Sequence, residues 1–135
     1  MVNAANAEKA EQAGIVKATR GDVVLQSSAG ATHAATAGDQ IAPSDRIVTG
    51  ANSGASVVLR DGTALVVGPS SRLDLKTFSF DATTHSGSML VSLFKGSMRM
   101  VTGLIGKRQP DAVQISTRTA TVGIRGTDFI VEADE

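Results

Sequence analysis

The chain has 135 residues, with 13 basic and 13 acidic side chains, no cysteine, and only four aromatic residues, all of them Phe. This length fits one domain with a modest core. Zero net charge and the scarcity of aromatic stacking platforms argue against a nucleic-acid-binding protein. The lack of cysteine excludes disulfides, thiolate zinc sites and cysteine nucleophiles.

Residues 1–13 are alanine-rich and polar, and we expect a flexible lead-in that is too short to hold a helix alone. Within it, Ala5-Asn6-Ala7 has the small-x-small pattern of a signal-peptidase site. The segment is therefore either a signal-peptide remnant or an alanine-rich start with a chance match. No run approaches the ~20 apolar residues that a spanning helix needs, so we predict no transmembrane segment in this chain.

From residue 14 the pattern changes to short extended runs separated by Gly, Ser, Asp and Pro. Leu73 and Leu75 alternate with charged neighbours, which is typical of a half-buried strand. Asp61-Gly62 between two apolar runs predicts a tight hairpin turn. The predicted strands are 15–19, 22–26, 46–49, 55–59, 64–67, 72–75, 89–93, 97–101, 112–116, 121–124 and 128–132. Residues 14–135 are therefore predicted to form a single all-β domain of many short strands.

The inward positions of these strands give a predicted core of aliphatic residues, Met and one Phe. It consists of Val24, Ile47, Val57, Leu59, Leu65, Val67, Leu73, Leu75, Leu90, Leu93, Met98, Met100, Val113, Ile115, Val122, Ile124, Phe129 and Val131. Strand spacing alone leaves two architectures open, a β-sandwich and a β-solenoid.

Several segments in order resemble one known family. Gly123-Ile124-Arg125-Gly126-Thr127-Asp128-Phe129 is similar to the GVRGT-x-F signature that closes the FecR-type domain. Further matching segments begin at Gly21-Asp22-Val23, and roughly residues 15–132 are covered. The others are Ala37–Ile41, Asp45–Thr49, Ser53–Thr63, Pro69–Leu73 and Leu93–Ser97. Ser44 departs from the pattern, since the family usually has Gly before the aspartate that here is Asp45.

The resemblance implies an exported bacterial module, periplasmic or secreted, that senses or binds and does not catalyse. In the best-known relatives such a domain belongs to an anti-sigma regulator that relays the state of a TonB-dependent transporter. A protein partner in the envelope is therefore expected, and a solenoid-like stack of strands is favoured over the sandwich. A structural, adhesive or glycan-binding envelope module is the alternative.

No enzymatic constellation emerges from the residues. His33 and His85 lie in polar, loop-like stretches without the spacing of a metal pair, and no serine lies in a nucleophile elbow. The aspartates mostly occupy turn positions, where carboxylates bond the local backbone. We therefore predict no catalysis, no metal and no cofactor.

Two segments are predicted to form an interaction surface. The closing strand 128–132 offers an edge to which a partner strand can be added. The stretch 102–111, predicted as a loop, is either a partner-docking tip or a connection whose apolar residues pack back on the core. Arg125 either fixes a bend or contacts a partner. The candidate residues are Leu104, Ile105, Lys107, Arg108, Arg125, Asp128, Phe129 and Val131.

Overall fold

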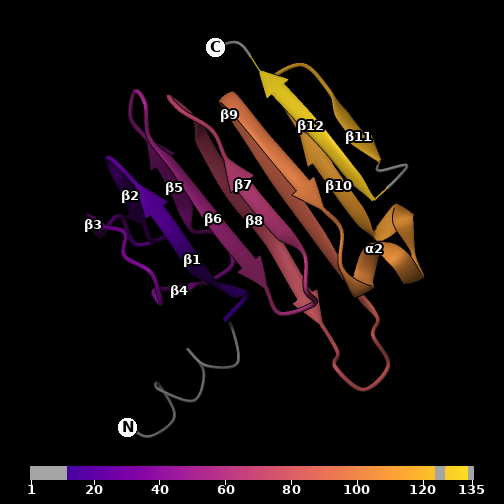
Figure 1. Cartoon of the computed structure of the whole chain (residues 1–135). Coiled ribbons are helices and arrows are strands. Elements are labelled where there is room, and N and C mark those ends of the chain that lie inside the picture. The colour runs from indigo at the N-terminus through magenta and orange to yellow at the C-terminus, as the bar shows by residue number, and fades with distance from the viewer. Residues whose placement is uncertain (1–11, 124–126, 134–135) are drawn as a thin grey trace, which may run out of the picture.

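A computed structural model describes residues 12–123 and 127–133 of the chain. Its strands are β1 (Gly14–Arg20), β2 (Val23–Gln26), β3 (Thr32–Ala34), β4 (Gln40–Ile41), β5 (Arg46–Thr49), β6 (Gly54–Leu59), β7 (Ala64–Val67), β8 (Arg72–Phe80), β9 (Gly87–Val101), β10 (Val113–Ser116), β11 (Thr121–Gly123) and β12 (Asp128–Ala133). Two short helical segments, α2 (Leu104–Arg108) and the 3₁₀ turn η1 (Pro110–Ala112), lie between β9 and β10. The all-β prediction is confirmed (Figure 1).

Long bent strands that alternate in direction make up most of the sheet. β3 and β4 form one such strand, β1 and β2 the next, followed by β5 with β6, β7 with β8, and the continuous β9. Beyond β9, β12 pairs antiparallel with residues 96–101, and β10 pairs parallel with residues 89–92 and antiparallel with β11. The strands therefore form one continuous, curled sheet with mostly antiparallel pairing, and among the described residues they do not form the solenoid-like stack that the family resemblance favoured.

The bends divide the sheet into two halves. We call β1, β4, β6, β7, β12 and residues 96–101 of β9 the A half, and β2, β3, β5, β8, β10, β11 and residues 87–95 of β9 the B half. The sheet curls at the bends, and buried side chains of both halves form one core. Val57 and Met98 contribute from the A half, and Ile47 and Leu73 from the B half.

A polar seam runs through the neighbouring bends. The Thr49 hydroxyl donates to the carbonyl of Gly68 (2.6 Å) and accepts from the backbone N–H of Ser71 (2.9 Å). The Ser71 hydroxyl in turn accepts from the N–H of Ser97 (3.0 Å). Thr49 and Ser71 are buried, so their hydroxyls satisfy backbone groups where the strand ladder is interrupted. Polar residues of three family-like segments are thus explained by the fold.

Most of the predicted core is buried, with clear exceptions. The buried members are Ile47, Val57, Leu59, Leu65, Val67, Leu73, Leu75, Leu93, Met98, Met100, Val113 and Ile115. The prediction was wrong for Val24 and Val122, which are 36% and 51% exposed. Leu90, Phe129 and Val131 are only half-buried, and Ile124 lies outside the described residues. Val24 is replaced in the core by its neighbours Val23 and Leu25, so β2 presents the opposite face.

Within the stretch 102–111, Leu104–Arg108 form helix α2 and the 3₁₀ turn η1 begins at Pro110, so the prediction of a loop was wrong for these residues. The turn after β6 holds it, because the buried carboxylate of Asp61 accepts from the N–H of Ile105 (3.2 Å). The Thr63 hydroxyl donates to the same carboxylate (2.9 Å) and accepts from the N–H of Gly103 (3.0 Å). These bonds bring α2 against the end of the A half, where it closes the core with Ile105.

Candidate interaction surface

β12 is paired along one side and open along the other among the described residues. The Thr102 N–H donates to the carbonyl of Thr127 (2.9 Å), just before the paired residues of β12 begin. Backbone groups in an antiparallel ladder alternate between the two sides of a strand. The N–H and C=O groups of Asp128, Ile130 and Glu132 therefore point away from β9. These three residues form the free edge.

An ion pair fixes the start of this edge. The Arg99 guanidinium donates through Nε to Oδ1 of Asp128 (2.9 Å) and through Nη2 to Oδ2 (2.6 Å). These hydrogen bonds hold the pKa of Asp128 below its ordinary value and raise the pKa of Arg99. Both side chains are about half exposed, so water screens the pair and its role is chiefly to orient the side chains.

The inner side of β12 is less well covered than the rest of the core. Phe129 and Val131 are half-buried and pack against the core, whereas Val122 on β11 is 51% exposed although its cross-strand neighbour Ile115 is fully buried. A cleft of about 250 Å³ lies between the end of β12 and the β10–β11 turn. The A and B halves are thus incompletely closed on this side.

Apolar side chains gather on the outer face of the A half. Val66, Arg99 and Ile130 are directly aligned across β7, β9 and β12. Ile130 is 67% exposed and Val66 45%, and the neighbouring Val101 is 38% exposed. Arg99 lies between Val66 and Ile130, so apolar and charged side chains alternate on this face.

Helix α2 lies at the beginning of β12, where the Thr102–Thr127 bond joins the two segments (Figure 1). Leu104 is 39% exposed, and Lys107 and Arg108 are also exposed. Ile105 is buried, as expected of a residue that packs back on the core. The structure therefore brings the two predicted segments together but assigns their apolar residues different roles.

The predicted surface residues fall into three groups. Leu104, Lys107, Arg108 and Asp128 are exposed, whereas Ile105, Phe129 and Val131 face the core to different degrees. Arg125 lies outside the described residues. The predicted segment 128–132 contains Ile130, but the list of candidate residues omitted it, although it is the most exposed large hydrophobic residue of the described chain. Its position between outward Asp128 and Glu132 could have revealed it, because alternate residues of a strand share a face.

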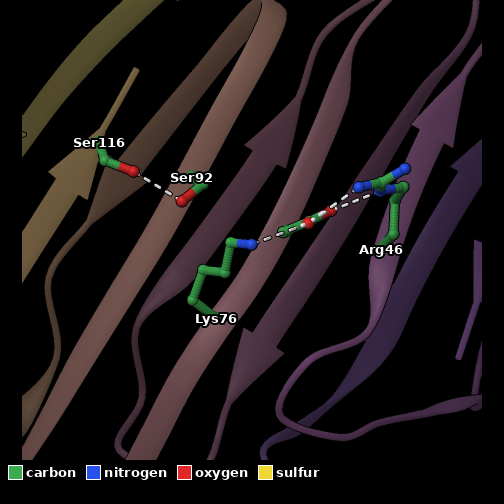
Figure 2. Close-up of polar contacts among 5 residues, drawn as sticks. Arg46, Lys76, Ser92 and Ser116 are labelled. Atoms are coloured by element: carbon green, nitrogen blue, oxygen red, sulfur yellow. Dashed lines mark hydrogen bonds and ion pairs between the residues drawn. The ribbon is translucent and has the colours of Figure 1, made fainter. Parts of the chain in front are cut away.

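A second polar cluster lies on the outer face of the B half (Figure 2). Asp74 is 7% exposed and accepts two hydrogen bonds from Arg46 (2.6 and 3.1 Å), with Lys76 3.6 Å from the same carboxylate. Both cations also lie over the ring of Phe94, at 5.4 and 5.7 Å. The cluster borders a polar cleft of about 320 Å³, but its buried carboxylate is fully engaged.

Nothing in the described chain gathers three metal-ligating His, Asp or Glu side chains. The histidines are separate: His33 lies 3.3 Å from Asp39, and His85 stacks on Phe80. Among the residues that the structure describes, the buried carboxylates are Asp61 and Asp74, and both are engaged in structural contacts. The helices of the described residues are too short and polar to cross a membrane.

The fold is all-β, and its exposed edge strand β12 carries Ile130 between the charged residues Asp128 and Glu132. The model of the FecR protein family matches residues 45–135, which comprise β5 to β12. The chain therefore belongs to the FecR family, whose members are signalling-related. No curated protein and no solved structure matches the chain.

Proposed function

We propose that this protein is a non-catalytic, exported module that binds a protein partner in the bacterial envelope by strand addition to β12. The free edge of β12 carries this proposal, because Asp128, Ile130 and Glu132 present backbone donors and acceptors to solvent. An extended partner segment can satisfy them and continue the sheet.

Two neighbouring features support the same location. Ile130 and Val66 provide exposed apolar area on the outer face. Burial of this area would add affinity and specificity to the main-chain hydrogen bonds of an added strand. Helix α2, which carries the exposed residues Leu104, Lys107 and Arg108, begins two residues after Thr102, whose N–H bonds the carbonyl of Thr127 just before β12. The partner is therefore expected to contact both β12 and α2.

Family membership and the small-x-small pattern at Ala5-Asn6-Ala7 support the part of the proposal that places signalling in the envelope. Cell fractionation of the native protein tests this part of the proposal. Recovery with periplasmic or secreted proteins supports export, whereas recovery only with cytoplasmic proteins contradicts it.

Affinity capture from an envelope extract tests strand addition, with Ile130→Pro as the decisive variant. Proline removes the N–H that Ile130 presents at the free edge, and an edge strand tolerates it because that N–H makes no bond to β9. Thr32→Pro is the matched control, since Thr32 presents its backbone at the free edge of β3. Circular dichroism verifies that both variants remain folded.

We expect the wild-type protein and Thr32→Pro to retain the same envelope protein, and Ile130→Pro to lose it. Hydrogen exchange of the complex should then protect the backbone of Ile130 and Glu132. Equal retention by folded Ile130→Pro would exclude β12 as the binding edge.

A further inference from the structure

The free edge of β12 has an unbalanced charge at one end. Asp128 and Glu132 both lie at exposed positions of β12, and Asp128 is paired with Arg99, whereas Glu132 borders the cleft that Arg118 also lines. Glu132 is exposed and takes part in no ion pair recorded among the described residues. A strand added here therefore meets a carboxylate that it can neutralise.

The inner side of the same edge is apolar. Side chains of an added strand opposite Phe129 and Val131 fall on the inner side of the sheet, because successive residues alternate between faces. They would enter the incompletely closed side of the fold, where both residues are half-buried and Val122 is 51% exposed. Apolar, β-branched side chains suit these two positions.

A second copy of this chain fits the edge poorly. Antiparallel pairing of two β12 strands centred on Ile130 would place Asp128 opposite Glu132 of the second copy, and the reverse. Like charges directly opposite one another destabilise an antiparallel pair. The acidic edge therefore discourages self-association and favours a strand of opposite charge.

Building on the proposed function, we propose that β12 binds an extended segment with a basic residue opposite Glu132 and apolar residues opposite Val131 and Phe129. The segment runs antiparallel to β12, and its backbone pairs with Asp128, Ile130 and Glu132. Its basic side chain pairs with Glu132 on the outer face. Its two apolar side chains cover Val131 and Phe129 on the inner face.

Two synthetic peptides test the proposal by NMR titration of the intact chain. The peptide Thr-Lys-Val-Thr-Val-Thr-Ser places Lys opposite Glu132 and its two Val residues opposite Val131 and Phe129, and the comparison peptide has Glu in place of Lys. We expect the Lys peptide to bind about threefold to tenfold more tightly, given the size of cross-strand charge effects. The amides of Ile130 and Glu132 should gain protection from exchange.

A second experiment reverses one charge in the protein and repeats the peptide titrations. Glu132→Lys should reverse the preference between the peptides, whereas Asp22→Lys, the same change of charge at an exposed position away from β12, should preserve it. Equal affinity of both peptides at β12 would overturn the charge pattern while leaving strand addition intact. Failure of both peptides to protect the amide of Ile130 would overturn the proposed segment. The Ile130→Pro capture experiment independently decides whether β12 binds any strand. Dimerisation of the free chain through β12 would also overturn the proposal.

Discussion

The hydroxyl of Ser71 occupies the space that a side chain at position 96 would need. Gly96 has a φ of +93° at the point where β9 passes between the two halves, and a Cβ there would collide with the Ser71 side chain and backbone. Ser71 cannot easily withdraw, because it is buried and bonded to Ser97 and Thr49. The glycine and the serine are therefore required together.

We predict that Gly96→Ala lowers the free energy of unfolding by about 2 to 4 kcal/mol, from the positive φ and the collision combined. Gly38→Ala is the control, because Gly38 has a φ of +97° but open space around its Cα. It should cost only the conformational part, about 1 to 2 kcal/mol. Chemical denaturation measures both, and equal losses would show that Ser71 makes room.

Ser44 adopts a left-handed conformation, with a φ of +76°. This conformation suits the glycine that the family resemblance predicts at this position, because L-residues adopt a positive φ at a cost. The Ser44 N–H bonds the carbonyl of Leu75 (2.6 Å) in the same turn. Ser44→Gly should raise the free energy of unfolding by about 0.5 to 1 kcal/mol, after the greater freedom of the unfolded glycine is subtracted.

Asn52→Gly is the comparison for this gain. Asn52 also has a positive φ, +56°, but asparagine tolerates that region better than serine does. Thermal unfolding should therefore show a smaller gain, or none. A loss of stability in Ser44→Gly would mean that the serine side chain contributes more than its backbone conformation costs.

Sequence patterns predicted the fold class and most of the core because apolar and polar residues alternate along most of the strands, and this alternation shows which side chains are buried. Leu73 and Leu75 are flanked by charged residues, so both were expected on the buried face of the strand. The sequence did not show which face of β2 is buried, because Val23 and Val24 are both apolar. The bend after Gly21 decides which of the two enters the core. Val122 lies opposite the buried residue Ile115, as its predicted inward position requires, but it is exposed because few residues cover the edge strand β11.

The elements missed by sequence reasoning lacked a periodic signal. β3 and β4 have three and two residues, and β3 is wholly exposed, so no apolar alternation marks them. Helix α2 has five residues, too few for a helical pattern, and depends on tertiary bonds to Asp61. Pairing of distant charges, such as Arg99 with Asp128, depends on strand register and is equally invisible in the chain.

The dependence of α2 on Asp61 is testable. Asp61→Ala leaves the buried N–H groups of Thr63 and Ile105 without their acceptor, and should cost about 2 to 4 kcal/mol. Hydrogen exchange should accelerate most at Leu104 and Ile105. Asp81→Ala removes an exposed turn carboxylate with similar local bonds to Thr83, and water can replace it. Its effect should stay within about 1 kcal/mol, and an equal effect would contradict the special role of Asp61.

The last prediction concerns acid stability. Because hydrogen bonds from Arg99 lower the folded-state pKa of Asp128, this carboxylate contributes stability above the ordinary aspartate pKa, and the contribution is lost as pH falls through the lowered value. Arg99→Gln should raise the pKa of Asp128 toward its ordinary value and reduce this acid-dependent loss. Carboxyl NMR titration measures the shift, and denaturation at a series of acidic pH values measures the stability.

Asp45 serves as the internal control in the same titration. Burial raises its pKa, so its ionisation opposes folding and its stabilising contribution disappears as pH rises through the raised value. Asp45 lies in the turn before β5, and Arg99 is not among the groups that shift it. Arg99→Gln should therefore leave the raised pKa of Asp45 in place. A shift of both carboxyls would indicate a general rearrangement, and no shift of Asp128 would show that the ion pair does not persist in solution.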